Sequence, residues 1–189
     1  IRDRDHVLRS ALRAAQKSFL RIVHFVVMNN HLHLIVEATD TTSLSKGLTG
    51  LGVRISRNLN KLWQRAGSVF RDRFHLRRLR TPRQVRNAIR YVLMNAFKHG
   101  ANGLGVPDPH SSAEYFDGWT DCGPIEIWGG SPVVAPRVFN LREGWLRAGG
   151  MLSLRECPAS WHRRSAREEA TVPRTARPDV RHPRPPGSR

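Results

Sequence analysis

Apolar residues recur at helical spacing near the start of the chain, and they predict a helix over residues 5–18. Shorter apolar stretches follow at residues 21–28 and 31–37. The segment MNN at 28–30 between them is typical of a tight turn, so the two stretches predict a β-hairpin. The buried positions of the helix would be Leu8, Ala11, Leu12, Ala15 and Phe19.

The clearest amphipathic pattern begins near Ser43. Leucine or isoleucine then recurs every three or four residues to residue 62, with basic side chains on the other faces, which predicts a long helix. Residues 69–79 mix β-branched and aromatic residues with arginines and predict a half-exposed strand. A last helix is predicted over residues 82–98, with Thr81 as its N-cap and Gly100 as its stop.

The predicted order of elements is α-β-β-α-β-α. With one strand placed before Ile1, it becomes β-α-β-β-α-β followed by a helix, which is the split βαβ arrangement. Helices would then cover one face of an antiparallel sheet and leave the other face open. We therefore expect an α+β fold whose first strand lies outside this sequence.

The amino-acid composition changes after Gly100. This change predicts a compact domain over residues 1–105, followed by segments of different character. Residues 106–158 have the composition of a loop-rich, mostly irregular extension, in which aromatic residues can support a short helix. Residues 159–189 are rich in proline and arginine with almost nothing to bury, so they predict a disordered tail.

Positive charge is concentrated in the first of these segments. Residues 1–105 hold 20 Lys and Arg against five acids, whereas residues 106–189 hold 12 against 10. Neutralising phosphates releases counterions and supplies much of the affinity of proteins for nucleic acid. The charge therefore favours a nucleic acid as partner of residues 1–105, and a merely solvated basic surface is the alternative.

Cysteine content and hydropathy indicate the cellular compartment and whether the protein crosses a membrane. The two cysteines, Cys122 and Cys157, provide neither a disulfide framework nor a zinc ligand set, which favours a reducing cytoplasm. No segment reaches the roughly 20 apolar residues of a membrane span. We expect a cytoplasmic protein with no membrane partner.

Two histidines stand one residue apart in the stretch VVMNNHLHLIVEA at 26–38. On a strand, His31 and His33 would project from one face, while Leu32 and Leu34 would project from the other toward the helices. Both imidazoles would then lie on the open face, close enough to bind one cation. A pair of ordinary histidines is the more common explanation of such a motif, so a third ligand is needed.

The predicted helix at 82–98 offers a third ligand and a nucleophile. Its buried stripe is formed by aliphatic residues, and Tyr91 and Asn95 lie together off that stripe, one turn apart. The other tyrosine of the chain, Tyr115, falls in the loop-like region. An ordinary surface tyrosine is the alternative for Tyr91, but its occurrence together with the histidine pair favours a site.

The order and spacing of four segments resemble those of a known family. These segments are the stretch VVMNNHLHLIVEA, the amphipathic helix after it, GSVFRDRFH at 67–75 and RYVLMNAFKHG at 90–100. The chain resembles, over residues 1–105, the IS200-like transposases (HUH, or Y1, transposases), and within them the REP-associated tyrosine transposases. The resemblance implies a ferredoxin-like sheet and an enzyme that cleaves and rejoins single-stranded or hairpin DNA in transposition.

The resemblance also implies roles for individual residues. His31, His33 and Asn95 would bind Mg²⁺ or Mn²⁺, and Tyr91 would attack the DNA to form a 5′-phosphotyrosine. His75 can assist, although a structural role suits it better. Candidates for holding the DNA are Arg54, Arg57, Lys61, Arg73, Arg77, Arg78, Arg86 and Arg90.

Other classes remain open at this stage. A catalytically inactive RNA- or single-strand-DNA-binding module of the same fold would explain the charge, but not Tyr91 and Asn95 beside the two histidines. A relaxase or replication initiator would share the chemistry, but such chains are generally larger and order their motifs differently. The sequence also leaves open the DNA sequence recognised and whether a homodimer exchanges helices between active sites.

Overall fold

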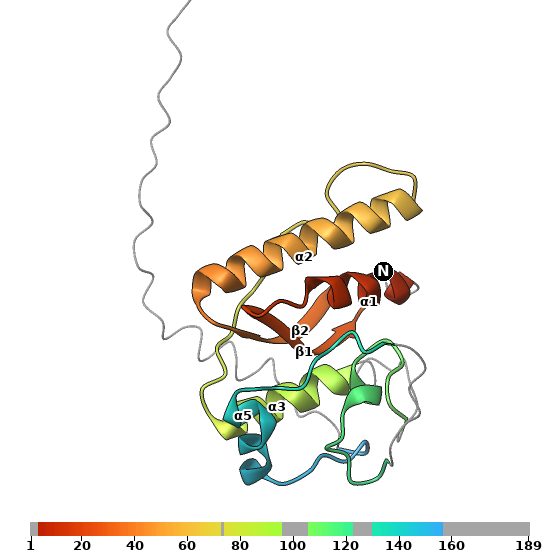
Figure 1. Ribbon diagram of the computed structural model, residues 1–189. Coiled ribbons are helices and arrows are strands. Elements are labelled where there is room, and N and C mark those ends of the chain that lie inside the picture. The colour runs from red at the N-terminus through yellow and green to blue at the C-terminus, as the bar shows by residue number, and fades with distance from the viewer. Residues whose placement is uncertain (1–3, 73, 96–105, 123–129, 157–189) are drawn as a thin grey trace, which may run out of the picture. The chain divides into compact units, whose positions relative to one another are not determined.

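The structure is a computed structural model that describes residues 4–72, 74–95, 106–122 and 130–156. This part of the chain has an α+β fold with a two-stranded antiparallel sheet (Figure 1). The elements in chain order are α1 (Asp5–Ala15), β1 (Leu20–Val27), β2 (Leu32–Ala38), α2 (Thr41–Leu62), α3 (Pro82–Leu93), η2 (Ala113–Tyr115), α5 (Phe139–Arg142) and η3 (Gly144–Ala148).

The first helix and the hairpin confirm the predictions, with small shifts at the ends. Helix α1 stops at Ala15 because the Gln16 side chain bonds across to the backbone of Ile22, accepting from its N–H at 2.9 Å and donating to its carbonyl at 3.1 Å. Strands β1 and β2 pair antiparallel from Leu20↔Ala38 to Val27↔Leu32. The turn between them is closed by a backbone hydrogen bond from Met28.

The long helices are fixed at their N-termini by side-chain caps. Helix α2 begins at Thr41, two residues before the predicted Ser43, because the Asp40 carboxylate accepts hydrogen bonds from the Ser43 N–H at 2.8 Å and from its hydroxyl at 2.7 Å. These bonds lower the pKa of Asp40 to about 2. Helix α3 has the predicted Thr81 cap, completed by Gln84 in a capping box. The predicted end at Gly100 lies outside the described residues.

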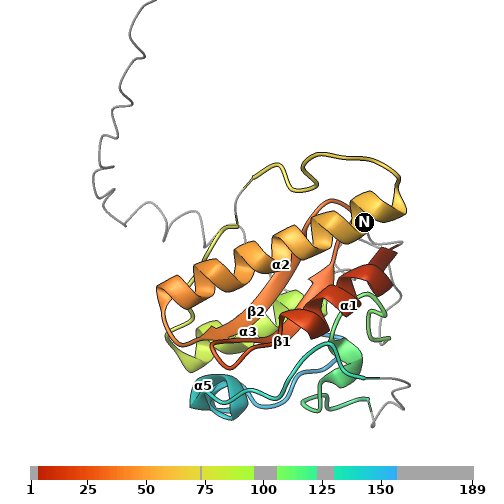
Figure 2. The ribbon, with the colours of Figure 1, turned by 45° about the horizontal axis from the view of Figure 1, so that its top comes forward.

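Helices α1 and α2 cover one face of the sheet, and their shared interface is the main hydrophobic core (Figure 2). The alternate residues Leu32, Leu34 and Val36 of β2 pack against this core, as the sequence predicts. The fully buried side chains of the core include Leu8, Leu12, Ile22, Phe25, Ile55 and Leu59.

The prediction that the other face of the sheet stays open is wrong. Helix α3 packs on that face against both strands, and η3 and α5 pack on the far side of α3 (Figure 1). The reason lies in β1, whose residues are nearly all buried, so the strand needs cover on both faces. His24 and Val26 belong to the buried set that does not face α1 and α2.

The prediction of a strand over residues 69–79 is also wrong for the described residues 69–72 and 74–79. Among the described residues, β2 pairs only with β1, so no neighbouring strand provides ladder hydrogen bonds to this segment. Val69 and Phe70 pack against the core, whereas Phe74 and Leu76 are exposed, at 46% and 51%.

Residues 106–156 are part of the fold rather than an appended extension. The backbone of residues 110–112 pairs with the free edge of β1, where Val27 N–H donates to the His110 carbonyl at 2.8 Å and Ser112 N–H donates to Phe25 at 2.9 Å. Further along β1, Val134 N–H donates to the Ile22 carbonyl at 3.1 Å. The described parts of residues 1–158 therefore form one compact unit. The predicted disorder of residues 159–189 lies outside the described residues.

One buried histidine makes stability depend on pH. His24 lies between the Ser112 hydroxyl, at 3.4 Å, and the Phe116 ring, and burial lowers its pKa to about 4. Since the unfolded value is about 6.5, the folded state favours neutral His24, and stability is lost as pH falls from about 6.5 toward about 4. We expect urea unfolding to show about 2 kcal/mol less stability at about pH 5 than at about pH 7. His24→Leu should remove most of this difference; a difference that persists would assign it to other groups.

Candidate metal and tyrosine site

His31 and His33 lie side by side on the face of the sheet that α3 covers. Their Nε2 atoms are 3.0 Å apart, with the rings nearly perpendicular at a centroid distance of 4.6 Å. His31 is exposed, at the start of β2, and His33 is half-buried. Both imidazoles therefore direct the same ring nitrogen toward one point, as the alternation along the strand predicts.

Asn30 determines the orientation of the His31 ring. Its side-chain oxygen is 2.6 Å from His31 Nδ1, so Nδ1 carries the proton and donates it to Asn30. This tautomer leaves a lone pair on Nε2, the atom that faces His33. Asn30 was predicted only as a turn residue, and its one signal in the sequence was its position directly before the histidine pair.

Tyr91 brings a hydroxyl to the same place from α3. Its oxygen lies 3.5 Å from His33 Nε2, and the two rings meet edge to face with centroids 5.1 Å apart. Both residues belong to one chain, so this pairing forms without a second subunit. The side chain is only 8% exposed, so the expectation that Tyr91 lies away from buried positions is wrong. The last turns of α3 are covered on both sides, by the sheet and by η3.

Burial also sets the protonation of Tyr91. Loss of solvent raises the pKa of the phenol, and the nearby Asn95 amide offsets this only in part. The hydroxyl is therefore neutral at pH 7. Any reaction in which Tyr91 is a nucleophile needs a group that stabilises the phenolate or activates the electrophile.

Asn95 completes the cluster one turn after Tyr91. Its side chain is fully buried at 0% exposure, and among the described residues neither Oδ1 nor Nδ2 has a hydrogen-bond partner that meets normal geometry. An unsatisfied buried amide costs about 1–3 kcal/mol, so such a group usually has a purpose or an additional partner. Asn95 lies one turn from Tyr91, whose hydroxyl is 3.5 Å from His33 Nε2, and its amide oxygen is of a kind that can serve as a third ligand for a cation.

The side chains of His31, His33 and Asn95 can be compared with the ligands that Mg²⁺ and Mn²⁺ prefer. Within the described ranges, no group of three His, Cys, Asp or Glu side chains could hold a metal ion, so a metal site here depends on Asn95. Two imidazole nitrogens and one amide oxygen fit Mn²⁺ better than Mg²⁺, because Mg²⁺ strongly prefers oxygen ligands. The residues therefore fit the expected group, with His31, His33 and Asn95 as its holders.

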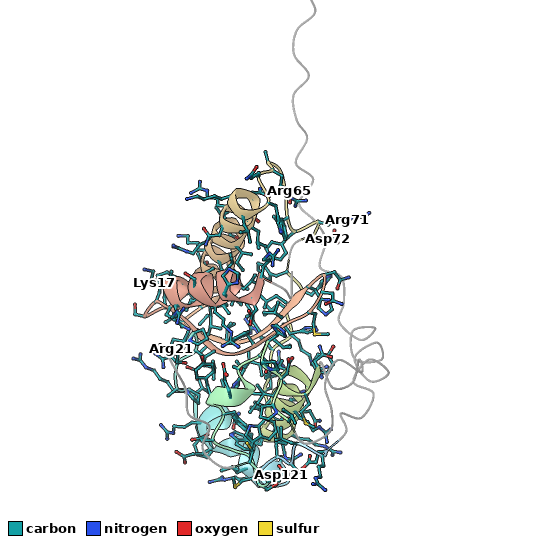
Figure 3. The ribbon with its side chains drawn as sticks, turned by 90° about the vertical axis from the view of Figure 1, so that its right-hand side faces the viewer. Lys17, Arg21, Arg65, Arg71, Asp72 and Asp121 are labelled. Carbon is teal, nitrogen blue, oxygen red and sulfur yellow. The ribbon has the colours of Figure 1, made fainter. Side chains whose placement is uncertain are left out.

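The basic residues predicted to hold DNA fall into different environments. Arg54, Arg57, Lys61 and Arg78 are exposed, whereas Arg77 is half-buried and Arg73 lies outside the described residues. The first three lie on one exposed face of α2, opposite the buried residues of that helix. Figure 3 shows the charged side chains that surround the folded part of the chain.

Arg86 and Arg90, which were also predicted to hold DNA, form contacts within the protein. Arg86 is 8% exposed and donates to the carbonyls of Gly150 and Met151, both at 3.1 Å, and to Glu156 at 3.0 Å. Arg90 reaches the same Glu156 carboxylate at 3.5 Å. Both arginines face residues 150–156, which the sequence treats as an irregular extension, so their partner could not be identified from spacing within α3.

Tyr115, the other tyrosine of the chain, lies in a separate environment. It is half-buried on η2, packs against the core between α1 and α2, and receives a hydrogen bond from Arg9 at 3.2 Å. His75, in the segment before α3, is exposed. Neither residue is among the contacts of the His31, His33 and Tyr91 cluster.

Comparisons with protein-family models, with curated proteins and with solved structures find no match to this chain. In the part of the chain that the structure describes, no helix is long and apolar enough to cross a membrane. Function is therefore argued from the residues of the cluster themselves.

Proposed function

We propose that this protein is a metal-dependent tyrosine transposase of the IS200-like, REP-associated type, which cleaves and rejoins single-stranded or hairpin DNA. The observation that supports this most is the convergence of His31 Nε2, His33 Nε2 and the Tyr91 hydroxyl, with the buried Asn95 amide one turn after Tyr91. A binding module would not need a buried phenol next to two orienting imidazoles.

The proposed reaction follows from the groups in the cluster. The Tyr91 oxygen attacks a backbone phosphorus, the bond from phosphorus to the 3′ oxygen breaks, and a 5′-phosphotyrosine and a 3′-OH result. The phenolic proton leaves Tyr91, and the departing 3′ oxygen gains a proton. A divalent cation, when bound, would polarise the phosphate and stabilise the charge that develops on it. The covalent link keeps the phosphodiester bond energy, so a later 3′-OH can reseal the strand without ATP.

We infer that the sheet belongs to a ferredoxin-like arrangement, in which a further strand would pair with the outer edge of β2. The α1–β1–β2–α2 order supports this inference, as does the outer edge of β2, which has no strand beside it in the described ranges. The register supports it as well. Because the Phe25 carbonyl accepts from Ser112, the backbone of its partner Leu34 is directed away from β1, where a further strand can pair.

Covalent capture tests the proposed reaction. The full-length protein, incubated with hairpin oligonucleotides and Mn²⁺ or Mg²⁺, is expected to yield an adduct that survives denaturing electrophoresis. His31→Ala and His33→Ala should each reduce adduct formation by about 100-fold or more, because each removes one ligand of the ion. His6→Ala, at an exposed position of α1, is the matched control and should change nothing.

Asn95→Ala tests the third ligand separately. It should raise the metal concentration needed for half-maximal adduct formation by about 10-fold to 100-fold, while stability rises or stays constant because an unsatisfied buried amide is removed. DNA binding without any adduct, in every metal tried, would instead support the binding-module alternative.

A further inference from the structure

The C-terminal end of α2 presents an exposed tryptophan paired with an arginine. Trp63 caps the helix through its N–H, which donates to Leu59 at 2.8 Å, and its side chain is 36% exposed. The Arg65 guanidinium lies over the indole at 5.0 Å from the ring centroid. One face of the indole thus carries a cation, and part of the ring remains accessible.

The backbone after α2 holds this pair in place. Gln64 adopts a left-handed conformation with φ of 50°, which is uncommon for a residue other than glycine. The Asn60 side chain accepts from Arg65 Nε at 3.1 Å and donates to the Gly67 carbonyl at 2.7 Å. Arg65 is therefore positioned over Trp63 before any ligand arrives, which lowers the entropy lost on binding.

Charge identifies the kind of partner. Between Thr41 and Asn95 the sequence contains one acidic residue, Asp72, and 13 Lys and Arg. Some arginines of α1, β1 and α3 form ion pairs, for example Arg21 with Glu37 and Arg86 with Glu156. The exposed residues Arg54, Arg57 and Lys61 follow one face of α2 up to Trp63. A ridge of unneutralised cations that ends at an exposed indole suits a single nucleic acid strand.

The position of Trp63 relates it to the metal and tyrosine site. Helix α2 starts directly after β2 ends and runs back over the sheet, so its C-terminal end returns to the end of the sheet where β2 begins at Leu32, the residue after His31 (Figures 1 and 2). Figure 3 shows Arg65 and Arg71 at one end of the molecule. A strand that passes along α2 therefore reaches the end of the sheet at which the cluster lies.

We propose that Trp63, with Arg65 on its other face, is a stacking site for an unpaired base of single-stranded DNA, and that Arg57 and Lys61 bind the phosphates beside that base. This site extends the proposed function, because it takes the same DNA at a position away from the cleaved phosphate. Stacking on an aromatic ring does not depend on base identity, so the site supplies affinity and register rather than sequence specificity.

Paired oligonucleotides separate stacking from phosphate binding. Affinity is measured by fluorescence anisotropy for an oligothymidylate of about 12 nucleotides and for an abasic strand of equal length and charge. All variants carry Tyr91→Phe and are measured without metal, so that no cleavage occurs and a failure of the proposed reaction cannot be mistaken for a failure of this site.

Trp63→Ala should raise the Kd for oligothymidylate about 10-fold and change the Kd for the abasic strand by less than about twofold, whereas Trp63→Phe should keep most of the affinity. Phe139→Ala is the matched control, because Phe139 is also exposed, at 43%, and pairs with Arg147 at 5.0 Å. Phe139 lies on the short helix α5 rather than on the basic face of α2, so the substitution should change neither Kd. Equal losses on both strands, or no loss on either, would overturn the stacking site.

Discussion

Replacing Tyr91 by phenylalanine is expected to abolish the covalent protein–DNA adduct while leaving DNA affinity within about twofold. The substitution removes one oxygen atom and keeps the ring that packs edge to face on His33. Its hydroxyl lies 3.5 Å from His33 Nε2, which is a long contact. Denaturing electrophoresis of labelled oligonucleotide measures the adduct, and anisotropy of the same oligonucleotide measures binding.

Tyr115→Phe is the control for this experiment. Tyr115 receives a hydrogen bond from Arg9, and its loss should lower stability slightly without affecting the adduct. Circular dichroism of both variants verifies that they fold. An adduct that persists in Tyr91→Phe but disappears in Tyr115→Phe would make Tyr115 the nucleophile and refute the assignment of the site.

Arg86→Met is expected to lower the free energy of unfolding by about 3 kcal/mol. The substitution removes the donors to the Gly150 and Met151 carbonyls and leaves Glu156 with Arg90 as its ion-pair partner among the described residues. The loss should be smaller than for a fully buried pair, because the Glu156 side chain is 32% exposed and water can solvate it. The urea unfolding midpoint at constant m-value measures the change.

Arg57→Met is the matched variant on α2. Arg57 is exposed, so the substitution should change stability by less than about 0.5 kcal/mol. It should instead weaken binding to single-stranded DNA and make that binding less dependent on salt, because one phosphate contact is lost. If Arg86→Met weakened DNA binding and left stability unchanged, Arg86 would bind DNA rather than stabilise the fold, and this prediction would be refuted.

Sequence periodicity and local hydrogen bonding determined the individual elements. The helical spacing of leucines in α2, the Thr81–Gln84 capping box of α3 and the two-residue spacing of His31 and His33 all depend on residues close together in the chain. Such interactions are satisfied by neighbours within a few residues, so the sequence contains all their partners. The placement of both imidazoles on one face of the sheet was predictable for the same reason.

Only the tertiary structure decided what lies against each element. The sequence did not reveal that α3 covers the second face of the sheet, that residues 110–112 pair with β1, or that Arg86 binds Glu156. Those contacts join residues about 60 to 90 positions apart in the chain. Helical periodicity also does not distinguish an arginine that is exposed from one that is buried against a distant segment. The alternation of residues placed His31 and His33 on one face, but the packing of a distant helix determined that Tyr91 meets His33.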